Sequence, residues 1–177
     1  MRGRRSLLAG VAAVATVAGG ARAQEPASPQ QQVDALLKEG VDYAKTQIRQ
    51  TFSFLPFALV VHADGHTERF RAPTGDELDA LDAPEQEADP ASALRELKQR
   101  IAREAKARGD FKVIGIFSDV DVKLPDGAPS DAIQASMEQA SGYCTDVFVP
   151  YQRVDEDHLT WGEPISSKAK GVVFSCK

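Results

Sequence analysis

The candidate chemistry of this chain begins with a glutamate in an alternating segment. Between residues 132 and 140, apolar and polar side chains alternate as in a β-strand, which places Glu138 on the face opposite the apolar side chains. A carboxylate that lines a cleft can act as an acid or a base, although most strand glutamates face water. We therefore treat Glu138, together with Asp131 and Tyr151, as candidate binding residues, and we assign no catalytic residue.

Two histidines at a predicted turn raise the question of a metal site. His62 and His66 flank the turn that contains Asp64, so three ligands could meet there. Structural zinc takes four protein ligands, and catalytic zinc takes three and a water. Since His158 is the only other histidine and no cysteine is near, we expect exposed turn histidines and no bound metal.

Other patterns that carry catalysis are missing from the sequence. It contains no G-x-S-x-G, no H-E-x-x-H and no glycine-rich phosphate loop. Asp119 and Asp121 share a strand face, but the acids around them do not have the spacing of a calcium loop. We expect solvent-facing carboxylates there, and no cofactor.

The chain has two cysteines, Cys144 and Cys176. In an oxidising compartment a disulfide between them accounts for both. The alternative is two separate thiols, of which Cys144 would be the nucleophile of an enzyme. We expect the disulfide, because each cysteine falls in a predicted β segment and pairing of the two segments would bring them together.

The first 23 residues are typical of a removable bacterial export signal. A charged start precedes an apolar run at 7–18, and the small-x-small sequence at 21–23 follows. This run is shorter than the ~20 apolar residues that cross a bilayer, so we expect cleavage before Gln24 and no transmembrane segment. The pair Arg4-Arg5 resembles a twin-arginine signal, and that route and the general route both stay open. Either route makes the mature protein periplasmic or secreted.

The net charge of the chain indicates which classes of partner it can bind. The full chain carries a net charge of −5, and loss of the signal removes four arginines, which leaves 17 basic against 26 acidic side chains and a net charge of −9. Nucleic-acid binding depends on Lys and Arg that neutralise phosphates, so no nucleic-acid partner is expected. The acidity favours a basic protein or a small molecule.

The first half of the mature chain contains a linker, a helix, a hairpin and a loop. Residues 24–32 are predicted to be a disordered linker before a single domain at 33–177. Apolar side chains recur every three or four residues in 33–52, which predicts an amphipathic helix. A hairpin is predicted at 54–71, and an acidic, proline-containing loop at 72–90 is expected to be mobile.

A second helix is predicted to begin at Asp89-Pro90, its cap and first residue, and to end at Gly109. Strands joined by short turns follow, and such strands must be antiparallel. The predicted strands, of which the last two are weaker, are 111–124, 132–140, 143–151, 158–161 and 171–176.

This order of elements predicts an α+β domain of two layers. An antiparallel sheet of five to six strands would carry both helices on one face, since two helices cannot cover both faces. The order ββ-α-βββ, preceded by a helix, resembles the profilin-like arrangement. A likeness in element order carries no function.

Three short motifs resemble a set of small, uncharacterised bacterial α+β domains. They are F-L-P-F-A at 54–58, D-A-I at 131–133 in the strand that carries Glu138, and P-Y at 150–151. The resemblance implies a shared fold over 33–151 and brings no activity with it. The sequence departs from the pattern at the residue after the glutamate, where a glutamine replaces a frequent histidine.

Two functions from different classes are therefore considered. The first is an exported, non-catalytic binding module that captures a basic protein or a small ligand. The alternative is a small exported hydrolase that uses Glu138 as its acid or base. The missing catalytic motifs favour the binding module.

Overall fold

The computed structural model describes residues 28–72, 89–155 and 158–177. The predicted export signal and residues 73–88 of the predicted acidic loop lie outside these ranges. The helices are α1 (Pro29–Thr51) and α3 (Pro90–Arg108), and the strands are β1 (Phe57–His62), β2 (Thr67–Arg71), β3 (Phe111–Lys123), β4 (Pro129–Gln139), β5 (Cys144–Arg153), β6 (Leu159–Trp161) and β7 (Ile165–Lys168).

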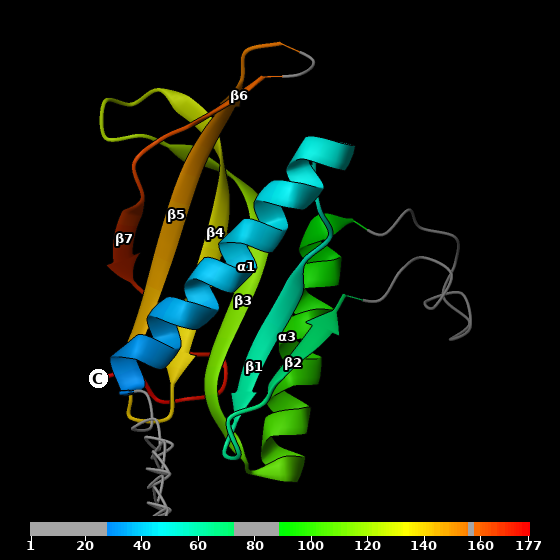
Figure 1. The fold of residues 1–177 in the computed structure, drawn as a ribbon, viewed down its shortest axis with the longest axis vertical. Coiled ribbons are helices and arrows are strands. Elements are labelled where there is room, and N and C mark those ends of the chain that lie inside the picture. The colour runs from blue at the N-terminus through cyan, green and yellow to red at the C-terminus, as the bar shows by residue number, and fades with distance from the viewer. Residues whose placement is uncertain (1–27, 73–88, 156–157) are drawn as a thin grey trace, which may run out of the picture.

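The seven strands of this described part form one antiparallel sheet (Figure 1). Its order is β2-β1-β3-β4-β5-β6, and β7 pairs with the other half of β5. The α+β class is confirmed, with one strand more than the sequence analysis expected. The additional strand is β7, whereas the weak strand predicted at 171–176 is not formed.

α1 begins inside the predicted linker. The Ser28 N–H donates to Gln31 Oε1 at 2.8 Å, and the Gln31 N–H donates to Ser28 Oγ at 3.3 Å. This reciprocal capping box satisfies backbone donors that a helix start would otherwise leave free. Residues 29–32, expected to be disordered, are therefore helical.

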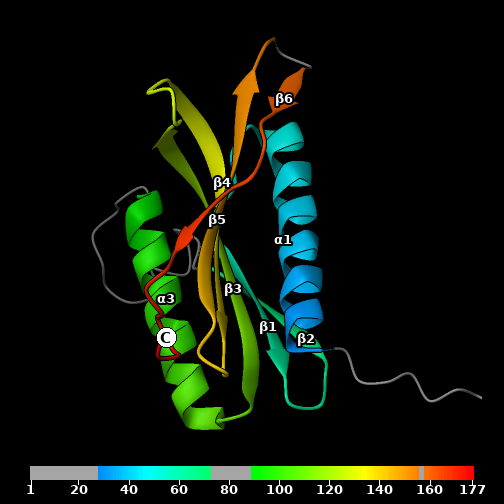
Figure 2. The same ribbon diagram turned by 90° about the vertical axis from the view of Figure 1, so that its left-hand side faces the viewer.

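α1 and α3 pack on opposite faces of the sheet (Figure 2). The prediction of two layers with both helices on one face is wrong, and the domain has three layers. The cause lies in the central strand β3, where every residue from Val113 to Ser118 is buried. Such a strand is apolar on both faces, and each face has to be covered.

The two faces have separate cores. On the α1 face the helix packs over β1, β3, β4 and β5, with the stacked rings of Phe57 and Phe117 near the centre at a centroid distance of 4.9 Å. On the other face α3 packs over β1, β2 and β3 through Ala93, Leu97 and Ile101. As predicted, α3 is capped by Asp89 and Gly109.

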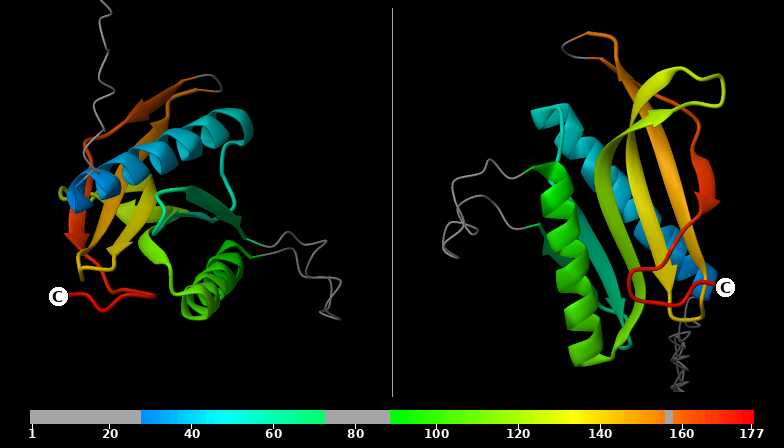
Figure 3. Two further views of the ribbon diagram at one scale, coloured as in Figure 1. Left: turned by 60° about the horizontal axis from the view of Figure 1, so that its bottom comes forward. Right: turned by 180° about the vertical axis from the view of Figure 1, so that it is seen from behind.

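The C-terminal segment after β7 lies on the α3 side of the sheet (Figure 3). Val172, Val173 and Phe174 pack against the α3 core beside the helix. These residues therefore cover a part of this face of the sheet that α3 does not reach.

Candidate functional site

Glu138 is placed on the predicted face of β4, but it does not line a cleft. Its side chain is 1% exposed. The carboxylate accepts three backbone hydrogen bonds, from Val172 at 2.6 Å, Val173 at 2.9 Å and Phe174 at 3.0 Å. Both oxygens are occupied by the C-terminal segment, so Glu138 anchors that segment to the sheet. This geometry gives no support to the alternative of a hydrolase acting through Glu138.

The other two predicted binding residues lie on the opposite face. Asp131 and Tyr151 are cross-strand partners in β4 and β5. Side chains alternate along a strand, so Asp131 points to the α1 face and Glu138 to the α3 face, and seven residues separate them by ~23 Å along the strand. The structure brings Asp131 and Tyr151 together and leaves Glu138 apart.

Asp131 and Tyr151 belong to an acidic cluster at the ends of β3 and β4. The Tyr151 hydroxyl donates to Asp119 Oδ1 at 2.7 Å, and Asp121 is the cross-strand partner of Asp131. Burial raises the pKa of Asp119, with repulsion from Asp131 and Asp121 acting in the same direction. Burial and then the negative charge of Asp121 raise the pKa of Asp131. Burial and mutual repulsion therefore disfavour the ionised forms of Asp119 and Asp131. Among the described residues, no other feature of this cluster indicates a ligand.

The disulfide between Cys144 and Cys176 is confirmed. Their Cα atoms are 5.5 Å apart, within the range that a bridge requires. Because these are the only cysteines of the chain, no free thiol is left to act as a nucleophile. The bridge fastens the C-terminal segment close to Glu138, since Cys144 is the cross-strand partner of that residue.

A polar cluster lies at the hairpin between β1 and β2. His62 was expected to be exposed, but its side chain is fully buried. Its Nδ1 lies 2.9 Å from Asp110 Oδ2, and its Nε2 lies 3.0 Å from Glu68 Oε2. The ring of the half-exposed His66 stacks on it at 4.0 Å. His62, His66 and Glu68 thus bring potential ligand atoms within 4.8 Å of one another.

Charged groups hold this cluster in place. The Arg108 guanidinium donates to Glu68 Oε2 at 2.8 Å. The hydrogen bond with His62 lowers the pKa of Asp110, and the charge of Arg108 adds to this effect. At the exposed end, Asp64 accepts from the His66 backbone and lies 2.6 Å from His66 Nδ1, and these contacts lower the pKa of Asp64.

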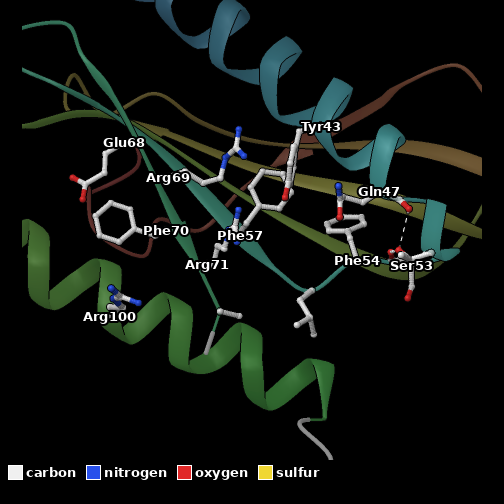
Figure 4. A pocket seen from close by; sticks show the side chains of 13 residues that line it. Tyr43, Gln47, Ser53, Phe54, Phe57, Glu68, Arg69, Phe70, Arg71 and Arg100 are labelled. Atoms are coloured by element: carbon white, nitrogen blue, oxygen red, sulfur yellow. Dashed lines mark hydrogen bonds between the residues drawn. The ribbon is translucent and has the colours of Figure 1, made fainter. Parts of the chain in front are cut away.

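A cavity lies along β2, between the two helices (Figure 4). Its volume is about 780 Å³. Arg69 and Arg71 reach it from β2 on the α1 side, and Arg100 reaches it from α3. Glu68 also lines it, and aromatic rings supply part of the remaining wall, namely Tyr43, Phe54, Phe57 and Phe70. The cavity is therefore basic and partly apolar, on a chain whose net charge is −5.

The arginines of this cavity rest on rings. The Arg69 guanidinium lies 4.1 Å from the centre of the Tyr43 ring, and that of Arg100 lies 5.7 Å from the centre of Phe70. Within the described ranges, neither these two arginines nor Arg71 forms an ion pair with a carboxylate.

Sequence reasoning did not single out Glu68, Asp110 or these arginines. Glu68 has a signal that could have been used, since residues 62 and 68 lie on neighbouring antiparallel strands and residue 66 lies in the turn that joins them. Asp110 has none, because it follows α3 and is 48 residues from His62. His158, the third histidine, is paired with Asp155 at 2.7 Å and takes no part in the hairpin cluster.

Comparison of the chain with protein-family models, with curated proteins and with solved structures finds no match. The resemblance to small bacterial α+β domains therefore stays a prediction. None of the described helices is both long and apolar enough to cross a membrane.

Proposed function

We propose that this protein is an exported, non-catalytic binding module whose ligand is an acidic peptide segment in an extended conformation. The segment would bind along the outer edge of β2, in the cavity between α1 and α3. The observation that carries the proposal is the group of three arginines around that edge, Arg69, Arg71 and Arg100, without carboxylate partners in the described ranges.

The backbone of β2 supports binding of an extended segment. Among the strands that the structure describes, β2 lies at the edge of the sheet and pairs with β1 alone. The His62 N–H donates to the His66 carbonyl, and the Ala72 N–H donates to the Pro56 carbonyl, both at 3.0 Å. Because the pattern alternates in an antiparallel pair, the intervening N–H and C=O groups at positions 67, 69 and 71 point away from β1. An added strand would pair with these groups.

The side chains around the edge favour an acidic ligand. Arg69 is oriented by its stacking on Tyr43, so less side-chain freedom is lost when it binds a carboxylate. Arg71 and Arg100 lie on the two sides of the sheet edge. Carboxylates on alternate sides of an extended ligand would meet one arginine on each side.

Two further observations support the class and the compartment. Both cysteines are in the disulfide, and Glu138 is occupied by backbone amides, so the candidates considered for catalysis have structural roles. A disulfide suits an oxidising compartment, which agrees with export directed by the signal at 1–23. Export through the twin-arginine route is part of this proposal, and replacement of Arg4-Arg5 by two lysines should abolish it.

The proposal is tested by fluorescence anisotropy with a labelled peptide in which Glu and Val alternate, long enough to cover β2. The double variant Arg71→Gln/Arg100→Gln should weaken binding by a factor of roughly five or more. Loss of the exposed ion pairs costs about 1 kcal/mol, which corresponds to that factor. Arg103→Gln, an exposed arginine of α3 outside the cavity, is the matched control. The same peptide with N-methylated amides on one edge should not bind, because it cannot pair with β2.

Three outcomes would contradict this assignment. Equal binding by the double variant and the unmodified chain would remove the arginines from the site. Preference for a matched Lys/Val peptide would instead favour the basic partner that the net charge indicates. Retained binding of the N-methylated peptide would exclude pairing along the strand edge.

A further inference from the structure

We propose that the hairpin between β1 and β2 is a binding site for a divalent transition-metal ion, with His62, His66 and Glu68 as its protein ligands. This inference does not depend on the peptide site. It rests on three potential ligand atoms within 4.8 Å of one another, contributed by the end of β1, the turn and β2. A tetrahedral ion with bonds of ~2.0–2.2 Å separates its ligand atoms by ~3.3 Å. Small side-chain movements therefore suffice to form the site.

In each histidine one ring nitrogen already contacts an aspartate, and this contact determines which nitrogen faces the ion. Asp110 occupies Nδ1 of His62 at 2.9 Å, and Asp64 occupies Nδ1 of His66 at 2.6 Å. In His66, Nε2 is the nitrogen left for a metal, and in His62, Nε2 already faces the ligand oxygen of Glu68. A carboxylate that accepts from the other ring nitrogen is the usual partner of a metal-bound histidine, because it orients the ring and raises its basicity.

Binding of the ion can be written as a balanced exchange. The ion enters between His62 Nε2 and Glu68 Oε2, now 3.0 Å apart, and the proton of this hydrogen bond is released to solvent. His66 is half exposed, so its ring can turn out of the stack and direct Nε2 to the ion. Arg108 donates to the same oxygen, Glu68 Oε2, and can stay there because a carboxylate oxygen has a second lone pair for the ion.

The ligand types select the class of metal. Two imidazole nitrogens and one carboxylate oxygen suit zinc, copper or nickel, whereas calcium and magnesium prefer sites made of oxygen alone. Three protein ligands leave a fourth position open on the side of His66, which faces solvent. A water, or a side chain of a bound partner, would complete the coordination there.

The measurement is calorimetric titration of the untagged chain with zinc chloride. One zinc ion should bind per chain, with a heat that changes with the ionisation enthalpy of the buffer, since a proton is released. His66→Gln should weaken the affinity for zinc by more than ~10- to 100-fold, which is the loss caused by removing a residue that only hydrogen-bonds a metal ligand. His66 is exposed, so this variant should keep the fold.

His158→Gln is the matched control, because His158 has the same contact of Nδ1 with an aspartate but no second histidine beside it in the described ranges. It should bind zinc as the unmodified chain does. Electron paramagnetic resonance with copper should show two coordinated nitrogens in the unmodified chain and one in His66→Gln. Failure of the unmodified chain to bind stoichiometric zinc, or unchanged affinity in His66→Gln, would overturn the site.

Discussion

Gly40 of α1 lies directly against the ring of Phe117 on β3, and a Cβ atom at position 40 would overlap that ring. Glycine inside a helix costs ~1 kcal/mol relative to alanine. Glycine at this position allows α1 to approach the sheet closely over the stacked rings of Phe57 and Phe117. This packing offsets the unfavourable helix propensity.

Gly40→Ala should therefore destabilise the domain although alanine is the better helix former. Forcing a methyl group against a ring in a filled core costs ~1–3 kcal/mol, which exceeds the gain in helix propensity. Urea unfolding monitored by circular dichroism measures the change. Gln50→Ala, at an exposed position of the same helix, is the control and should leave stability equal or higher. A more stable Gly40→Ala would mean that α1 is not held at this distance.

Glu138→Gln should loosen the C-terminal segment. The amide keeps the size of the side chain but loses the negative charge and one acceptor oxygen that serve the three backbone donors. Hydrogen bonds to a charged group contribute ~1.5–3 kcal/mol each, so we expect a loss of roughly 2–4 kcal/mol in unfolding free energy. Hydrogen exchange should accelerate first at Val172 to Phe174. Glu163→Gln, an exposed residue, is the control, and protection unchanged at these amides would refute the anchoring role.

The termini of α3 could be predicted from the sequence because they depend on neighbouring residues. Asp89, Pro90 and Gly109 define the limits of α3 by local capping, and the structure agrees. The placement of the helices could not be predicted in the same way. It depends on which faces of β3 need cover, and every residue from Val113 to Ser118 is buried, so both faces need it.

The candidate sites show the same limit. Glu138 was correctly placed on the face opposite the apolar side chains, but the residues that bury it are 34 to 36 positions away in a segment predicted to be a strand. His62 was expected to be exposed because Asp110, which contacts it across 48 residues, is not identifiable from the sequence. Residue type and spacing thus predicted the position of both side chains, and only the fold supplies their partners.

The disulfide should act together with Glu138 to hold the C-terminal segment. It closes a separation of 32 residues, for which the chain-entropy treatment gives ~3–4 kcal/mol. The denatured, unreduced protein should contain no free thiol, and reduction should lower the unfolding midpoint. Because both contacts fasten one segment, the loss in Cys144→Ser/Cys176→Ser combined with Glu138→Gln should be smaller than the sum of the separate losses. A strictly additive result would show that the two anchors are independent.

Asp119 should make the domain less stable as the pH rises. Burial, with repulsion from Asp131 and Asp121, raises its folded pKa above the ordinary value of 3.8. A carboxyl group with a raised folded pKa favours the folded state while it is protonated, and this contribution is lost as the pH rises through the folded pKa. Asp119→Asn imitates the protonated acid and keeps an oxygen that accepts from the Tyr151 hydroxyl.

Asp119→Asn should consequently be more stable than the unmodified protein at pH 7, and the difference should vanish below about pH 3.8, where the native carboxyl is itself protonated. Urea midpoints measured across this interval test both the sign and the pH range. Glu39→Gln, an exposed carboxylate on α1, controls for the change in net charge. A less stable Asp119→Asn at pH 7 would show that the hydrogen bond from Tyr151 to the charged carboxylate outweighs the effect of burial. An equal difference at all pH values would show that Asp119 has the same pKa in the folded and unfolded states.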